Sequence, residues 1–208
     1  MKNLLLLLLM TALPDTDKFL SEVELYQRDS YFKTKVYAEH TAPTFFALKE
    51  VNQPVDYRNY DLHLLNAAVF FATNQLRERK NLKPLLFNPG LRDAAVVHTY
   101  QMVTKKFFDH MNNKTRKLRT PDDRLELFVP GYSAGGENID YNHVSLPAKA
   151  TYADIAKLIV DDFFQSAPHK KNMMSKNFNS LGCAAQMELK PEGDQIYFKA
   201  TQDFGFLK

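Results

Sequence analysis

The fold of this chain is decided by the stretch Gly136-Glu137-Asn138-Ile139, which is followed further along by Ser166-Ala167-Pro168-His169-Lys170-Lys171-Asn172 and Leu181-Gly182-Cys183. Glu and His are residue types that bind metal ions and transfer protons. Both occur here at the ends of segments rich in turn residues, where we expect side chains to be directed at a site rather than buried. These motifs predict a site without identifying a reaction or a substrate.

Length and composition predict one main domain. The chain has 208 residues, of which 45% are hydrophobic and 12% aromatic, enough for one substantial core plus an extension. The net charge of +3 results from 27 basic and 24 acidic residues without a long run of one sign, so it indicates neither nucleic acid nor an anionic membrane as partner. The short basic blocks Lys114 to Arg119 and His169 to Lys171 are interpreted as solvated turns, with contact to a phosphate or lipid headgroup as the alternative.

Residues 1–14 have the pattern of a secretory signal peptide. Met1-Lys2-Asn3 gives a basic start, and the leucines from Leu4 to Leu9 form an apolar run too short to span a bilayer. A buried N-terminal helix is the alternative. No Cys follows the run, so a lipoprotein anchor is not indicated at that point. We therefore expect a secreted or periplasmic protein that is not transmembrane once the signal has been removed.

Residues 15–62 have no clean period but contain many aromatic residues, which argues against disorder. We expect them to form an N-terminal extension that packs on a domain covering residues 63–208. Within this domain, hydrophobic periodicity and capping residues predict four helices and two strands. The helices begin near Leu64, Leu91, Thr120-Pro121 and Thr151, and the strands cover Leu181 to Met187 and Ile196 to Phe204, joined by a loop at 190–194.

Three further residues have a structural and a functional interpretation. His98 lies on the apolar stripe of the second helix, where a core histidine bonded to a nearby carbonyl is favoured over a ligand. The single Cys183 cannot form an internal disulfide and is expected to be a small buried residue in a strand rather than a nucleophile. Ser166 precedes His169 by three residues at a helix end, and without a nucleophile-elbow motif it is expected to cap rather than to attack.

Taken in order, the motifs between Leu64 and Gly205 resemble those of the CAP superfamily, which comprises cysteine-rich secretory, antigen-five and pathogenesis-related proteins, and especially its bacterial SCP-like branch. Each motif is weak alone, and the shared order and spacing make the match specific. The motifs are Asn74-Gln75-Leu76-Arg77, Leu82 to Leu86, His98 with Met102, Phe107-Phe108-Asp109-His110, Thr120-Pro121 with Arg124, Gly131-Tyr132, Gly136-Glu137-Asn138-Ile139, Phe163-Phe164-Gln165-Ser166, His169, Asn172, Leu181-Gly182 and Thr201-Gln202-Asp203-Phe204-Gly205.

The resemblance implies an α+β fold, an α-β-α sandwich with a central antiparallel sheet, and a cleft that holds His and Glu side chains. Carried over by position, His110, Glu137 and His169 are the cleft residues. A second carboxylate is missing, because this chain has Phe163-Phe164-Gln165-Ser166 where many eukaryotic relatives have Trp-x-x-Glu. The disulfides of those relatives are absent too.

His110, Glu137 and His169 are candidate ligands for zinc or another divalent ion, since two imidazoles, one carboxylate and water suit such a site. Their wide separation in the sequence does not form a compact metal motif. The alternatives are a structural brace, in which Glu137 accepts hydrogen bonds, and catalysis. Ser166 and Asn138 are candidate cleft residues, although Asn138 and Asn172 also suit the bracing of loops.

The favoured function is an exported, non-enzymatic binding module that holds a metal ion or a small ligand in this cleft. Expected partners are an extracellular or envelope protein, a lipid or a small ligand, and not nucleic acid. One alternative is a metal-dependent hydrolase, resembling a protease, with Glu137 as general base. Another is a sterol- or lipid-binding protein with a groove lined by Phe128, Tyr132 and Phe163.

Overall fold

The computed structural model describes residues 15–145, 149–188 and 195–207. The predicted signal peptide and the predicted loop at 190–194 lie outside these residues. The helices are α1 (Asp15–Ser21), α2 (Lys35–Glu39), α3 (Ala42–Phe46), α4 (Leu62–Arg79), α5 (Pro89–Thr104), α6 (Pro121–Phe128), α7 (Tyr152–Gln165) and α8 (Ala167–Met173), with short 3-10 helices at Glu24–Gln27, Tyr31–Lys33, Glu50–Asn52 and Arg116–Leu118.

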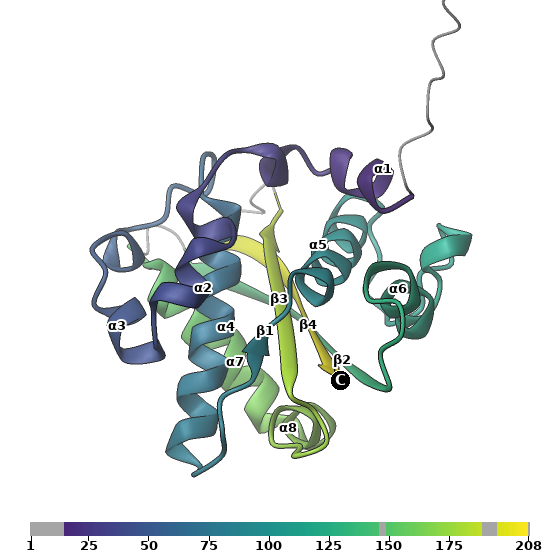
Figure 1. Cartoon of the computed structure of the whole chain (residues 1–208). Helices are drawn as coiled ribbons and strands as arrows, with labels where there is room; N and C mark the ends of the chain where they lie inside the picture. Colours follow the sequence, from purple (N-terminus) through teal and green to yellow (C-terminus); the bar gives the residue numbers. More distant parts are fainter. Residues whose placement is uncertain (1–14, 146–148, 189–194, 208) are drawn as a thin grey trace, which may run out of the picture.

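A four-stranded sheet runs through the centre of the molecule (Figure 1). Its strands are β1 (Leu86–Phe87), β2 (Ala134–Ser145), β3 (Ser180–Met187) and β4 (Gln195–Phe206), in the order β1-β3-β4-β2. The pairs β3–β4 and β2–β4 are antiparallel, whereas the two-residue β1 pairs in parallel with β3. The two edges of the described sheet are therefore β1 and β2.

Helices cover both faces of the sheet. Figure 1 shows α4 and α7 on one side of the strands, and α5 and α6 on the other. Alternation along β4 directs neighbouring side chains to the two layers: Gln202 donates to Thr73 of α4 (2.7 Å), and the Thr201 hydroxyl accepts from Thr99 of α5 (2.7 Å). The expected α-β-α sandwich of the α+β class is confirmed.

The helix starts follow the capping residues in the sequence. Thr120 and Asp123 form a capping box on α6, Thr151 and Asp154 form one on α7, and Asn88 accepts a hydrogen bond from the start of α5. Each side-chain oxygen satisfies a backbone N–H that has no partner within the helix. The predicted caps at Thr120 and Thr151 needed only local sequence, and they are confirmed.

The predicted environment of the Gly136-Glu137-Asn138-Ile139 motif is wrong. These residues lie within β2, not at the end of a turn segment, and the Glu137 side chain is buried. The strand has no alternating apolar pattern because its polar residues find partners in both helical layers. Periodicity therefore gave no signal for it. Cys183, in contrast, is buried in β3 as predicted, and burial raises the pKa of its thiol.

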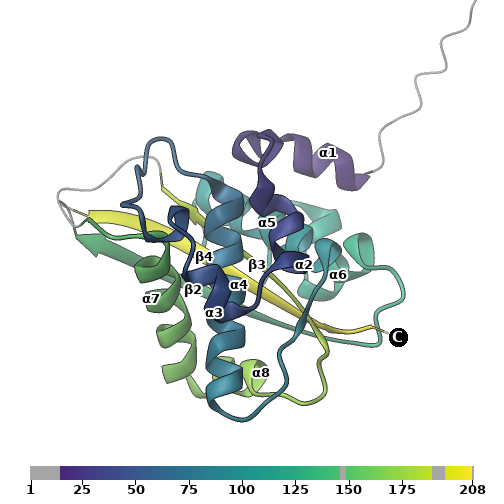
Figure 2. The same cartoon turned by 60° about the vertical axis from the view of Figure 1, so that its left-hand side comes forward.

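Residues of the extension are tied to α4 and α5. The Tyr26 hydroxyl bonds Asp93 (2.5 Å) and accepts from Arg92 (2.8 Å), and Arg92 also donates to the Lys33 carbonyl. The ring of Phe45 stacks on Phe71 with their centroids 4.3 Å apart. Figure 2 shows α1, α2 and α3 running along the outside of the helical layers. The division of the chain at residues 62 and 63 stays a prediction.

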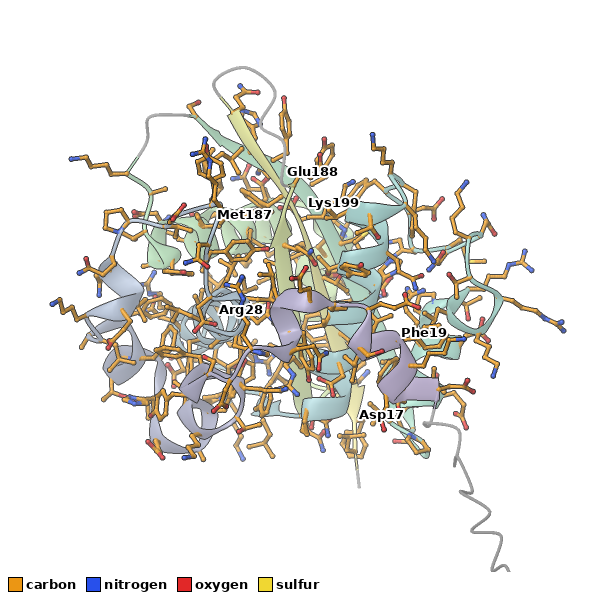
Figure 3. All side chains as sticks on the ribbon, turned by 90° about the horizontal axis from the view of Figure 1, so that it is seen from above. Asp17, Phe19, Arg28, Met187, Glu188 and Lys199 are labelled. Atoms are coloured by element: carbon orange, nitrogen blue, oxygen red, sulfur yellow. The ribbon has the colours of Figure 1, made fainter. Side chains whose placement is uncertain are left out.

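Lys199 connects the sheet to the end of α5. Its ammonium group donates to the Met102 carbonyl (3.0 Å) and pairs with Glu188 (3.0 Å), which lies beside it in Figure 3. A cation near the last carbonyls of a helix is favourable because of the helix dipole. None of the helices in the described ranges is long and apolar enough to cross a bilayer.

Gly182 allows α5 to approach β3 closely, and this predicts a severe effect of Gly182→Ala. A Cβ atom there would lie 2.0 Å from the Arg92 nitrogen and 2.2 Å from the Leu91 carbonyl carbon, both backbone atoms that cannot rotate away. We expect a loss of about 3 kcal/mol in unfolding free energy from this overpacking. Thermal denaturation should show a decrease in Tm of roughly 10 °C.

Gly205→Ala in the neighbouring strand is the matched control. Its Cβ would meet side-chain methyl groups of Leu91, at 3.3 and 3.4 Å, and the Ala134 carbonyl oxygen at an ordinary contact distance of 3.9 Å, so the expected loss is below about 1 kcal/mol. An equal loss of stability in the two variants would contradict the close approach at Gly182.

Candidate functional site

His110 and Glu137 form the centre of the candidate site. His110 lies in the segment after α5, and its Nδ1 donates to Glu137 Oε1 at 2.7 Å. The His110 side chain is 44% exposed, whereas that of Glu137 is 1% exposed. The pair therefore places a solvent-accessible imidazole on top of a buried carboxylate.

The second oxygen of Glu137 is held by Arg124 of α6. The distance from Arg124 NH2 to Glu137 Oε2 is 2.5 Å, and both side chains are excluded from solvent. Burial would raise the pKa of Glu137, but the hydrogen bond from His110, together with the charge and the hydrogen bond of Arg124, outweighs it and holds that pKa below its usual value. Glu137 is thus a buried anion whose two oxygens are both in use.

His98 and Asp203 surround this carboxylate on its inner side. His98 Nε2 is 3.9 Å from Glu137 Oε1, and burial lowers the pKa of His98 to about 4. Neither ring nitrogen forms a hydrogen bond of normal geometry with the described residues. The Asp109 backbone nevertheless lies close enough to raise the pKa of His98 slightly against the effect of burial, so it is the nearby carbonyl that the sequence predicted. Asp203 pairs with Glu137 in the ladder, and burial together with the Glu137 charge raises the pKa of Asp203.

His169 approaches the site from α8. Its ring packs edge-on against Phe163, with centroids 5.3 Å apart, and its carbonyl accepts from Asn138 Nδ2 at 3.1 Å. Burial and the nearby His110 lower the pKa of His169. The two histidines thus lie close enough to interact electrostatically, and both are partly exposed.

Asn138 is directed away from Glu137, because consecutive residues of a strand face opposite sides of the sheet. It is fully buried, and its amide group bonds the His169 carbonyl, the Gln202 side chain (3.0 Å) and Asn172 (2.9 Å). Asn138 and Asn172 therefore brace α8 against β2, and the structure does not bring Asn138 together with the Glu137 carboxylate.

Ser166 occupies the junction of α7 and α8. It is the N-cap residue of α8, but its side chain makes no capping hydrogen bond. Its carbonyl accepts a hydrogen bond from the Lys170 N–H of that helix (2.8 Å). Its expected position at a helix cap is confirmed, whereas the expected capping by its hydroxyl is not seen.

Sequence reasoning missed the roles of Arg124 and Asp203. Both were part of the motifs that resemble the CAP superfamily, but no local pattern assigns a partner to either residue. Arg124 is a basic residue of the short amphipathic helix α6, and its complete burial in the structure is what reveals its role as a partner of Glu137. Buried arginines need an anion or several carbonyls as acceptors.

The side chains of the candidate site suit zinc only if the two imidazoles are the ligands and Glu137 is not. Metal-bound histidines commonly donate their other ring N–H to a carboxylate, which is the arrangement of His110 and Glu137. Imidazole nitrogens of His110 and His169 would then hold the ion, with Glu137 orienting His110. In the described ranges, no group of three or more His, Cys, Asp or Glu side chains is arranged to hold a metal ion.

Arg124→Met should destabilise the protein because it leaves the Glu137 carboxylate buried without its cation. Loss of one partner of a buried ion pair costs about 3–5 kcal/mol. Adding Glu137→Gln should restore part of this loss, which urea denaturation of the two single variants and the double variant would measure. Arg119→Met, an exposed neighbour, should change stability by less than about 0.5 kcal/mol. Strictly additive effects of the two substitutions would contradict the pairing.

His98 should make stability depend on pH. The pKa of His98 is about 4 in the folded protein, whereas an unperturbed histidine has a pKa of 6.5, so the unfolded chain binds the proton first as pH falls. Stability is therefore full above pH 6.5 and decreases toward pH 4. Relative to His98→Gln, the parent should lose about 2–3 kcal/mol in urea denaturation between pH 7 and pH 4.5. The exposed His143→Gln variant should follow the parent, and identical pH profiles of the parent and His98→Gln would contradict the buried neutral imidazole.

Comparison with known proteins supports the fold and the motifs. The family model described as "CAP: Cysteine-rich secretory protein family" matches residues 70–198. The Bacillus subtilis proteins YkwD and YlbC, described as an uncharacterized protein and an uncharacterized membrane protein, are each 28% identical over 110 residues, which is 53% of this chain. The match covers 38% of YkwD and 28% of YlbC, so the chain spans less than half the length of either relative.

Among solved structures, an extracellular protein containing an SCP domain from Bacillus anthracis str. Ames has a TM-score of 0.54 and 25% identity. The match covers 72% of this chain and 43% of that one. Since the family model extends over more than half of the residues, from before the end of α4 into β4, this chain belongs to the cysteine-rich secretory protein (CAP) family.

Proposed function

We propose that this chain is an exported CAP-domain binding module that holds a ligand between His110 and His169 and does not catalyse a reaction. The observation that carries the proposal is the use of both Glu137 oxygens, one by His110 and the other by Arg124. The buried carboxylate orients an accessible imidazole, as carboxylates commonly do for histidines that bind metal ions.

The geometry disfavours the hydrolase alternative. A general base must reach the proton that it removes and must have a pKa near the working pH. Glu137 is excluded from solvent, and its pKa is held low by groups that include the permanently charged Arg124. Within the described ranges Ser166 has no hydrogen-bonded base, and no nucleophile-elbow sequence surrounds it.

The aromatic residues suggested for a lipid groove have other roles. Phe163 is completely buried in the main core, and Phe128 and Tyr132 pack on the smaller cluster around Leu91 and Leu125. Their contacts give no support to a sterol or lipid site formed by these three rings. A divalent ion held by the imidazoles, with zinc as the first candidate, is the ligand that the donor chemistry favours.

Two observations support export. Residues 1–14 have the signal-peptide pattern, and the Bacillus anthracis protein with the similar fold is described as extracellular. Secretion or a periplasmic location would also bring the site into contact with extracellular or envelope components, which are the partners proposed here.

Zinc binding tests the site directly. Calorimetry of the full chain at neutral pH should show micromolar zinc binding that is lost in His110→Ala and in His169→Ala. His143→Ala is the matched control, because this exposed histidine lies on the same strand as Glu137 but beyond the site, and it should bind as the parent does. No zinc binding by the parent, or unchanged binding by both site variants, would contradict the metal site.

The same samples test for turnover. We expect no hydrolysis of casein or of a p-nitrophenyl ester with or without zinc. A zinc-dependent hydrolysis that disappears with EDTA and in Glu137→Gln would show that the chain is an enzyme and would overturn the binding-module proposal.

A further inference from the structure

A basic surface lies at one end of the sandwich. Residues 77–83, at the end of α4, and residues 170–176, in and after α8, lie side by side at the bottom of Figure 1 and are called the basic end below. Arg77 NH1 joins them by donating to the carbonyls of Met173 (2.5 Å) and Ser175 (3.1 Å). The basic end contains one acid, Glu78, and seven basic residues: Arg77, Arg79, Lys80, Lys83, Lys170, Lys171 and Lys176.

The charge of the basic end is larger than that of the whole chain. Seven basic residues and one acid give +6, whereas the complete sequence has +3, so the remaining residues together carry −3. The moderate total therefore results from two parts of opposite sign. Clustered charge of one sign attracts ligands or surfaces of the other.

The cations of the basic end have no anionic partners in the part of the chain that the structure describes. None of the seven takes part in an ion pair there. The guanidinium of Arg77 is buried and bonds only carbonyls, including that of Lys83 (3.0 Å), and burial lowers its pKa. Lys80 and Lys170 lie over the ring of Phe164, 5.3 and 4.4 Å from its centroid.

An apolar hollow borders these charges. A cavity of about 650 Å³ lies between residues 77–86 and 176–179, and Leu82, Leu86 and Phe178 contribute its apolar walls. Arg77, Lys83 and Lys176 line the same cavity. Leu86, in the edge strand β1, is 68% exposed, far more than Phe108 at 47%, the next large hydrophobic residue in the described ranges.

This combination distinguishes between two kinds of anionic partner. A soluble polyanion would need only the charges and would leave Leu86 unexplained. An anionic bilayer offers phosphates to the lysines and an apolar layer, just below the headgroups, to a leucine between them. We propose that the basic end is a docking surface for an anionic phospholipid membrane, with Leu86 entering the interface between headgroups and acyl chains.

The test uses a fluorescent reporter at the proposed contact. Leu86→Cys in the full chain is labelled with a nitrobenzoxadiazole dye, while the buried Cys183 stays unlabelled in the folded protein. Vesicles of 30% phosphatidylglycerol and 70% phosphatidylcholine should shift the emission to the blue, and pure phosphatidylcholine vesicles should not. The reporter is specific to one position, so insertion of the apolar N-terminal residues alone would not produce this signal.

Two pairs of substitutions with equal charge change separate local from general electrostatics. Lys83→Gln with Lys176→Gln should raise the lipid concentration for the half-maximal shift by at least about tenfold. Lys114→Gln with Arg116→Gln, in the exposed basic block after α5, should change it by less than about twofold, because charges beyond a Debye length are screened. Circular dichroism of each variant checks that the fold is retained.

Several results would overturn the proposal. One is no emission shift from the dye at position 86, and another is an equal shift from a dye at the exposed Asn113→Cys. An equal emission shift with pure phosphatidylcholine vesicles would also contradict it. So would an equal change in the half-maximal lipid concentration for both pairs of substitutions. Binding of soluble polyphosphate through Lys83 and Lys176, with the reporter silent toward vesicles, would instead assign the surface to a polyanion. This test does not involve the histidine cleft, so its failure leaves the proposed zinc binding unaffected.

Discussion

The candidate site depends on the buried ion pair between Arg124 and Glu137. A carboxylate inside a sheet is costly to desolvate unless its oxygens receive strong hydrogen bonds. Arg124 supplies one of these and also donates to the carbonyls of Leu118 (2.8 Å) and His110 (3.0 Å). The same guanidinium therefore fixes α6, the segment that carries His110, and β2. The position of the accessible imidazole is set by the core and not by the flexibility of its own loop.

The edge strand β2 connects the two parts of the candidate site. Glu137 faces the layer of α5 and α6, where it meets His98 and His110. Asn138, the next residue, faces the opposite layer and holds α8 through the His169 carbonyl. The neighbouring residues Glu137 and Asn138 of β2 therefore hold the His110 ring and the His169 carbonyl, respectively. This explains why a site assembled from three distant segments needs no compact sequence motif.

Buried arginines paired with acids and the cations of the basic end lie in different parts of the fold. The buried cations Arg92 and Arg124 are paired with acids, whereas Arg77 bonds only carbonyls among the residues that the structure describes and lies beside exposed lysines. Charge at the first two positions is neutralised within the fold, whereas the cations of the basic end form no ion pair with the described residues. A total of +3 does not reveal this difference, because only the folded chain brings residues 77–83 and 170–176 together.

The sequence alone predicted α4, α5, α6 and α7, and it placed the starts of α6 and α7, since capping at Thr120 and Thr151 depends on neighbouring residues. It also identified the family, through motifs whose order can be seen without a structure, and through the family the sandwich fold. Only the tertiary structure decided that Glu137 is a strand residue with a buried side chain, and that Arg124 and Asp203 are its neighbours. The reason is physical: a polar residue in a strand has no periodic signature, and its burial becomes affordable only through partners that are distant in the sequence.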